Sequence, residues 1–278
     1  MKTMKTIIDV LGADKLDSLT KYPSIETFHI MDRGILRENE TNLTEEFGDR
    51  TLLVQEKIDG TNMRIIVSHD GYIIGSRNQL LSYRDDLIWS DLNAIMTKSF
   101  AEMIFVSLKD TEILKKHLLV FYGELYGGNI GKASRQYTKN KDLFCFRLFD
   151  VAKFDTQKVI EELFQTPVSS IKGLKRKYQN WIDITSHQKF DGFLEPLNEM
   201  NVKKVPAVGV YKLSKLDEDI ETVYKTHLSV FSKSQAKEEE GAKGKSEGII
   251  VRDEKRNFIR KLRFEDYQKT LRKQKKPF

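Results

Sequence analysis

The segment EKIDGTNMRIIV, residues 56–67, places a lysine directly before an Asp-Gly pair and between two apolar runs. TLLVQ precedes it and MRIIV follows it, so the pattern predicts a strand that ends near Lys57, a tight turn and a second strand. Taken alone, such a turn needs only a glycine with a permitted backbone angle. The same position suits a lysine nucleophile in a phosphate site, which needs burial or neighbouring cations to release its proton.

Size and composition favour a globular protein with a substantial core. The chain has 278 residues, of which 39% are hydrophobic and 32% charged, unlike a disordered chain. No apolar run approaches the roughly 20 residues that a transmembrane helix needs, and the N-terminal apolar patch is too short for a secretory signal. The single cysteine, Cys145, excludes an internal disulfide and fits a reducing compartment. We therefore expect a cytoplasmic protein without a membrane partner.

Charge points toward an anionic partner. The net charge is +6 and the sequence pI is about 9.1, a balance that favours polyanions such as nucleic acids. The last ten residues, KTLRKQKKPF, hold five basic groups and no acid. Such a run is either a solvated tail or a phosphate-binding segment. KGLKRKYQ, residues 172–179, is a second exposed basic stretch that could grip a polyanion.

The apolar periodicity predicts a mixed α and β chain. Strands are expected at 51–57, 118–127, 143–151, 205–213, 246–253 and 257–264, with a hairpin over 63–77 that turns at His69, Asp70 and Gly71. Helices are expected at 85–109, 155–164 and 215–231. Residues 169–204 are ambiguous, and the polar, low-complexity stretch 232–246 is expected to be a mobile loop.

The fold class expected from this order is α+β, one domain built on antiparallel sheet. Only about 32 residues follow the 232–246 loop, too few for an independent domain, so the last two strands should return to the same core. We expect an N-terminal extension packed on the core (1–50), a catalytic domain (51–268) and a basic tail (269–278).

Charged residues inside apolar runs are the candidate site residues. The two-residue period of FIRKLRF places Lys261 and Arg263 on one face of a strand, which is either a half-exposed edge or a floor that faces an anion. Glu124 and Glu247 interrupt the apolar runs VFYGELYG and EGIIV, although each alone also fits a strand end. The adjacent Gly123 and Gly248 would let a ligand approach the backbone.

Six short motifs, in the order EKIDG, GSRN, FYGELYG, FRLFDV, SEGIIVR and RKLRF, together resemble the covalent nucleotidyltransferases. That superfamily comprises ATP-dependent DNA and RNA ligases and mRNA capping enzymes. EKIDGTN and the upstream KYPSIETF are most similar to RNA ligases of the nick-sealing type. The resemblance implies an ATP-grasp-like adenylation domain with antiparallel sheets. The short remainder after Arg263 leads us to expect no C-terminal oligonucleotide-binding barrel.

The resemblance also implies roles for individual residues. Lys57 would attack the α-phosphate of ATP and carry AMP, while Lys261 and Arg263 would neutralise that phosphate as catalytic cations. Arg263 departs from the lysine common at its position, and its planar fork binds phosphate differently. The implied cofactor-binding residues are Glu56, Asp59, Gly60, Arg77, Glu124, Phe149 and Lys261.

Further implied roles concern the base, the nucleic acid and the metal. Phe149 would stack on the purine, with Phe144 and Phe146 as alternative rings. Asn62 and Arg77 would engage the nucleic-acid end or the phosphates. Glu247 and Asp150 would organise metal-bound phosphates, with Mg²⁺ or Mn²⁺ as the ion.

Several reactions remain open at this point. The favoured one is sealing of RNA 5′-phosphate and 3′-hydroxyl ends through lysyl-AMP and an adenylylated 5′ end. The alternatives are a minimal ATP-dependent DNA ligase, a capping guanylyltransferase and a non-catalytic nucleic-acid-binding module. The sequence does not choose between a nicked duplex and a broken single strand, or exclude DNA-containing ends. A compact ligase of this type would suit a virus or phage acting in a host cytoplasm.

Overall fold

The computed structural model describes residues 9–81, 91–185 and 187–274. These residues form two compact units, each assembled from three separate stretches of the chain. Unit 1 comprises 1–23, 61–125 and 144–204, and unit 2 comprises 24–60, 126–143 and 205–278. The boundaries expected at residues 50 and 268 stay predictions. No helix among the described residues is both long and apolar enough to cross a membrane.

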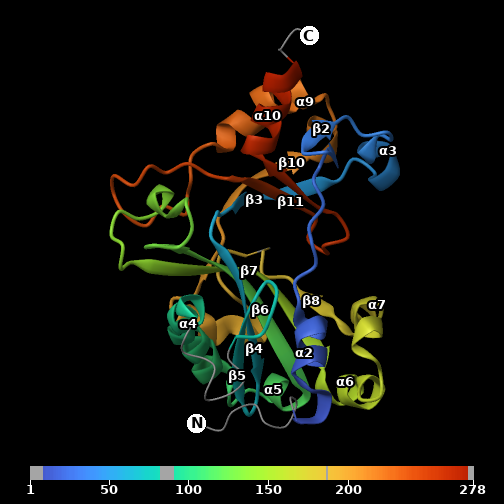
Figure 1. The fold of residues 1–278 in the computed structure, drawn as a ribbon, viewed down its shortest axis with the longest axis vertical. Coiled ribbons are helices and arrows are strands. Elements are labelled where there is room, and N and C mark those ends of the chain that lie inside the picture. Colours follow the sequence, from blue (N-terminus) through green and yellow to red (C-terminus); the bar gives the residue numbers. More distant parts are fainter. Residues whose placement is uncertain (1–8, 82–90, 186, 275–278) are drawn as a thin grey trace. The chain divides into compact units, whose positions relative to one another are not determined.

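Unit 1 is built on a sheet with the strand order β5-β4-β6-β7-β8, in which β9 also pairs with β7. Its strands are β4 (Thr61–Ser68), β5 (Gly71–Ser76), β6 (His117–Gly127, reaching into unit 2), β7 (Phe144–Asp155), β8 (Asn180–Ile182) and β9 (Lys203–Lys204). Its helices are α2 (Ala13–Thr20), α4 (Leu92–Leu108), α5 (Glu112–Lys116), α6 (Thr156–Leu163), α7 (Val168–Tyr178) and the 3-10 helix η3 (Gly192–Asn198). Figure 1 shows α2, α6 and α7 on one side of this sheet and α4 on the other.

Unit 2 contains an antiparallel sheet with the order β10-β3-β11-β12. These strands are β3 (Thr51–Lys57), β10 (Ala207–Lys212), β11 (Gly248–Arg252) and β12 (Ile259–Arg263), beside a small hairpin of β1 (Ile30–Asp32) and β2 (Ile35–Arg37). Its helices are α3 (Leu43–Phe47), η2 (Ser134–Gln136), α8 (Leu213–Leu216), α9 (Ile220–Thr222), η4 (Val223–Leu228), η5 (Ser229–Phe231) and α10 (Phe264–Gln274). One apolar core lies under the sheet and includes Leu52, Val54, Ile249, Val251 and Leu262.

Most expected strands are present. β3 occupies the predicted residues 51–57, β4 and β5 form the hairpin, and β11 pairs antiparallel with β12. Helix α6 begins after Asp155, whose carboxylate accepts a hydrogen bond from the backbone N–H of Lys158. The helix predicted at 85–109 is α4, and its expected residues 85–90 lie outside the described residues.

Three expectations in unit 2 differ from the structure. The helix predicted at 215–231 is broken into four short pieces, because Asp219 caps a new start by accepting from the N–H of Thr222. Residues 269–274 belong to α10, in which Thr270 and Leu271 are buried, while 275–278 lie outside the described residues. The 232–246 stretch is held by hydrogen bonds rather than left free, as described below.

Candidate active site

In unit 2, Lys57 lies at the end of β3 in a row that crosses three strands. Gly248 of β11 is the register partner of Lys57 on one side and of Arg263 on the other. Residues directly opposite one another point to the same face of a sheet, so Lys57 and Arg263 flank a position that has no side chain. Two residues further along this face, Lys261 is the partner of Ile250. The predicted common face for Lys261 and Arg263 is therefore confirmed.

Glu247 joins the two cations of this row. One of its carboxylate oxygens accepts a hydrogen bond from Lys57 Nζ, and the other accepts from Arg263 Nε at 2.7 Å. The side chain of Glu247 is 12% exposed, while those of Lys57 and Arg263 are 26% and 36% exposed. The Lys57–Glu247–Arg263 cluster is thus partly accessible from solvent, and an anion can reach its cations.

Acidic neighbours shift the pKa values of Arg263 and Asp59 in this cluster. Burial lowers the pKa of Arg263, but the carboxylates of Glu247, Asp266 and Glu265 together outweigh that effect, so the pKa is raised overall. Burial raises the pKa of Asp59, and the nearby charge of Glu247 adds to the rise. Asp59 and Glu247 therefore compete for the same positive charges, and further cationic charge would relieve their repulsion.

The turn after Lys57 is fixed from both sides. The backbone N–H of Asp59 donates to the hydroxyl of Tyr137 at 2.7 Å. Burial raises the pKa of that Tyr137 hydroxyl, which keeps it neutral. Glu56, immediately before Lys57, is buried and accepts from the N–H groups of Gln235 and Ala236. Hydrogen bonds between side chains and backbone N–H groups therefore hold the residues on both sides of Lys57.

We expected Gly248 and Gly123 to leave room for a ligand, but the structure gives a different reason for glycine at these two positions. A Cβ on Gly248 would lie 2.2 Å from the carbonyl oxygen of Leu262, and one on Gly123 would lie 2.3 Å from the ring of Phe146. Both glycines are required because another part of the same unit packs against them.

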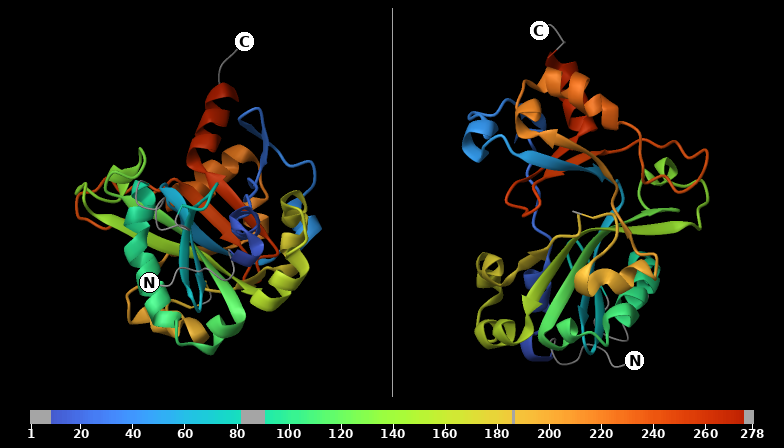
Figure 2. Two further views of the ribbon diagram at one scale, coloured as in Figure 1. Left: turned by 60° about the horizontal axis from the view of Figure 1, so that its bottom comes forward. Right: turned by 180° about the vertical axis from the view of Figure 1, so that it is seen from behind.

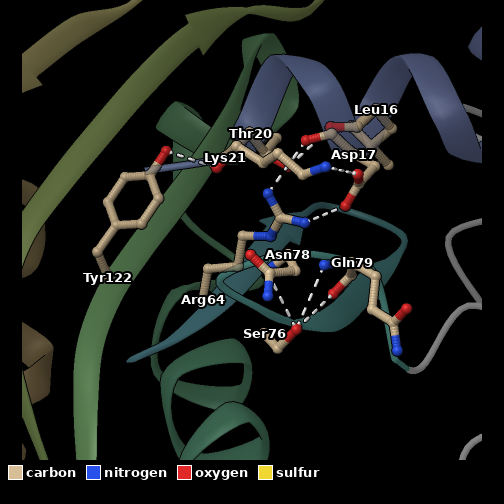
Figure 3. Close-up of polar contacts among 9 residues, drawn as sticks. All are labelled: Leu16, Asp17, Thr20, Lys21, Arg64, Ser76, Asn78, Gln79 and Tyr122. Carbon is tan, nitrogen blue, oxygen red and sulfur yellow. Dashed lines mark hydrogen bonds and ion pairs between the residues drawn. The ribbon is translucent and has the colours of Figure 1, made fainter. Parts of the chain in front are cut away.

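In unit 1 the structure brings further predicted residues together. Asn62 of β4 and Glu124 of β6 are register partners, so their side chains project from the same face. Arg77 is exposed in the turn after β5. That turn is closed by a 2.8 Å bond from the N–H of Ser76 to the carbonyl of Gln79, and the Ser76 hydroxyl contacts Asn78 and Gln79 (Figure 3).

Tyr22 links two predicted residues of β7 and was missed as a site residue. Its hydroxyl donates to Asp150, a carboxylate with only 1% exposure, and its ring meets Phe149 edge-on at 5.0 Å. Of the alternative stacking rings, Phe146 is buried and Phe144 is half-buried. The available signal was the motif KYPSIETF, which contains Tyr22 but gives no indication of a partner 128 residues away.

The segment that carries Tyr22 is attached by a buried arginine. Arg64 of β4 donates to the carboxylate of Asp17 and, at 3.0 Å, to its backbone carbonyl. The hydroxyl of Tyr122 donates to the carbonyl of Thr20 at 2.9 Å. Figure 3 shows the guanidinium of Arg64 beneath α2, and the amine of Lys21 also reaches the Asp17 carboxylate, at 2.6 Å.

The predicted metal ligands are hard oxygen donors. Asp150 lies in unit 1 and Glu247 in unit 2. Among the residues that the structure describes, no group of three or more His, Cys, Asp or Glu side chains could hold a metal by itself. A single carboxylate in either unit fits Mg²⁺, which is commonly held by one or two carboxylates together with phosphate oxygens and water.

Comparisons with known proteins give a family for most of the chain. A family model described as RNA ligase matches residues 50–267. No curated protein sequence matches the chain. Among solved structures, the chain is similar to three forms of Naegleria gruberi RNA ligase. A mutant with AMP and Mn has a TM-score of 0.51 and 17% identity, and the match covers 88% of this chain and 61% of that chain. A mutant with ATP and Mn (TM-score 0.50, 18% identity) and a form with PPi (TM-score 0.50, 17% identity) each match over 90% of this chain and 62% of that chain.

This chain spans about 61–62% of the length of those structures. At such identity the likeness is one of fold. It confirms the expected fold class, a mixed α+β architecture with antiparallel sheets.

Proposed function

Because this chain belongs to the RNA ligase family, we propose that it is an ATP-dependent RNA ligase that uses Lys57 as the nucleotide-accepting nucleophile. It joins a 5′-phosphate to a 3′-hydroxyl. The observation that carries this proposal is the Lys57–Glu247–Arg263 cluster, in which one lysine, one carboxylate and one guanidinium meet on an accessible sheet end. RNA is the proposed substrate, either as a nicked duplex or as a broken strand.

The first step is attack of Lys57 Nζ on the α-phosphorus of ATP. A nitrogen–phosphorus bond forms, the bond from the α-phosphorus to the oxygen bridging to the β-phosphate breaks, and pyrophosphate leaves. The attacking ammonium first loses a proton, and the Glu247 carboxylate is the hydrogen-bond acceptor beside it. Phosphoryl transfer depends mainly on positioning and charge neutralisation, which Arg263 and Lys261 provide from the same face.

The remaining residues hold the nucleotide and the RNA end. Glu124 would bind the ribose hydroxyls, and Phe149 would stack on adenine. When bound, Mg²⁺ or Mn²⁺ neutralises phosphate charge, and Glu247 and Asp150 are its proposed protein ligands. AMP then passes from Lys57 to the RNA 5′-phosphate, and the 3′-hydroxyl attacks that phosphate and releases AMP. Asn62 and Arg77 would position the RNA end for these steps.

The test is covalent labelling with nucleotide. Purified protein is mixed with Mg²⁺ and with ATP or GTP labelled at the α-phosphate, beside Lys57→Ala and a matched control, Lys212→Ala. Lys212 is an exposed lysine on β10, the strand next to β3 in the same sheet. We expect label from ATP in the wild type and in the control, and none in Lys57→Ala.

Other results would redirect or refute the proposal. Label from GTP alone would favour a capping guanylyltransferase. Label from ATP followed by sealing of nicked DNA but not of RNA would favour a DNA ligase. Folded wild-type protein that takes label from neither nucleotide would contradict a catalytic role.

A further inference from the structure

Two surface loops of unit 2 are bonded to each other along their length. They comprise residues 132–142 and 232–246, and we call them the paired loops. Backbone N–H groups of Glu238, Lys243 and Gly244 donate to carbonyls of Tyr137, Arg135 and Gln136 at 2.9, 3.1 and 2.9 Å. Figures 1 and 2 show the loops side by side, the first in green and the second in orange-red. The low-complexity stretch 232–246 is therefore held in place by these hydrogen bonds.

The paired loops are attached on both sides of the proposed nucleophile. Glu56 accepts from the N–H groups of Gln235 and Ala236 at 2.8 and 2.9 Å, and Ala236 is fully buried. On the other side of Lys57, Asp59 donates to the hydroxyl of Tyr137, which belongs to the first loop. The surface is thus bonded directly to both residues that frame the Lys57 turn.

The outer side of the paired loops is strongly basic. Eight exposed cationic side chains lie on them against four acidic residues. The cations are Lys132, Arg135, Lys139 and Lys141 on the first loop and Lys233, Lys237, Lys243 and Lys245 on the second.

Two of the four acids also serve internal bonds. Glu239 accepts from the N–H of Asn140 at 2.8 Å, and Glu238 accepts from the hydroxyl of Tyr126 at 2.6 Å. Within the described part of the chain, none of the eight cations is in an ion pair.

We propose that the paired loops bind the sugar–phosphate backbone of RNA and lead the strand to be joined to Lys57. This inference rests on the proposed function and extends it to the place where the RNA lies. Lysine and arginine contacts to phosphate position a nucleic acid without reading its sequence, as suits an enzyme that seals ends in many contexts. A preformed loop pair also loses little conformational entropy on binding.

The experiment uses the full chain and three quadruple variants. The first changes the four lysines of the second loop to alanine, and the second changes the four cations of the first loop. The control changes four exposed lysines elsewhere, so that the net charge falls equally. Its positions are Lys158, Lys212, Lys215 and Lys255.

Binding of a fluorescent nicked RNA duplex with a 5′-phosphate is measured across a range of salt concentrations, without nucleotide. Each lysine that contacts a phosphate contributes roughly 0.9 to the slope of log K against log salt on a duplex. We expect either loop variant to bind about tenfold or more weakly than the control and to show a shallower salt slope. Labelling with ATP should be unchanged in all three variants, because that step needs no RNA.

The outcomes separate this inference from the proposed function. Loop variants that bind RNA as tightly as the control overturn the inference even if lysyl-AMP forms normally. Wild-type protein that binds no RNA also overturns it. Weakened RNA binding by both loop variants supports it, and it does so even if Lys57 takes no label.

Discussion

Both units contain a charged cluster built around a strand cation, Arg64 in unit 1 and Lys57 in unit 2, and the two clusters differ in access. In unit 1, the Arg64 side chain is 1% exposed and bonded to Asp17. In unit 2, the side chains of Lys57 and Arg263 are 26% and 36% exposed and share Glu247. Both clusters pair opposite charges, so pairing alone does not identify chemistry. The buried cluster can only hold α2 in place, whereas the accessible one can exchange its carboxylate partner for a phosphate.

The largest expected effect on stability comes from the buried cluster. Arg64→Ala leaves the Asp17 carboxylate without its buried partner and should cost about 3–5 kcal/mol of unfolding free energy. Lys21→Ala removes the other cation bonded to Asp17, but its side chain is 42% exposed, so it should cost less than about 1 kcal/mol. Urea unfolding measures both. Equal losses would mean that burial does not distinguish the two contacts.

In the accessible cluster we expect a substitution to change mainly the rate of lysyl-AMP formation. Arg263→Ala should slow formation of lysyl-AMP roughly 100–1000-fold, because it removes a preorganised cation at the α-phosphate. Arg260→Ala is the matched control on the same strand, since Arg260 pairs with Glu26 and lies over the ring of Phe258. Single-turnover labelling compares the variants. A rate loss in Arg260→Ala as large as in Arg263→Ala would refute the claim that only the face of β12 that carries Arg263 acts in catalysis.

A smaller loss of stability should distinguish two tyrosine hydroxyls, one bonded to a buried carboxylate and one to an exposed carboxylate. Tyr22→Phe removes a donor to the buried Asp150 and should cost about 1–3 kcal/mol of stability. Tyr178→Phe removes a similar bond to Glu162, whose side chain is 40% exposed, and should cost less. Thermal and urea unfolding test the pair. If Tyr178→Phe is less stable than Tyr22→Phe, burial of the accepting carboxylate does not decide the cost.

The smallest effect concerns pH. Burial lowers the pKa of His29, which contacts the hydroxyl of Tyr267 at 2.7 Å. Below the ordinary value of 6.5, the unfolded chain takes up a proton that the folded chain does not, so stability should fall until the pH reaches the lowered pKa. His29→Gln should remove part of this decline in urea unfolding, whereas His69→Gln, at an exposed histidine, should not. If stability declines equally with falling pH in both variants, His29 is not the source of the decline.

Local pattern predicted the elements that position the proposed nucleophile. The apolar alternation of 51–57 and 259–263 gave β3 and β12 and the shared face of Lys261 and Arg263. These features follow from the two-residue period of a strand and need no knowledge of distant contacts.

Long-range contacts account for what the sequence did not reveal. The 232–246 stretch resembles a mobile loop by composition, but the buried carboxylate of Glu56, about 180 residues away, and backbone bonds to residues 135–137 fix it. Tyr22 reaches Asp150 across a comparable separation. No periodicity in a single sequence reports such partners. The broken helix at 215–231 was missed because the capping signal of Asp219 lies inside an otherwise helical pattern.

The most direct test of the account is to locate the AMP. Wild-type protein is incubated with ATP and Mg²⁺, digested under conditions that preserve phosphoramidates, and examined by peptide mass spectrometry. The account predicts AMP on Lys57 in the peptide that contains the Asp-Gly turn. AMP attached to another residue, or a fully unmodified Lys57 in protein that seals RNA, would contradict the central claim.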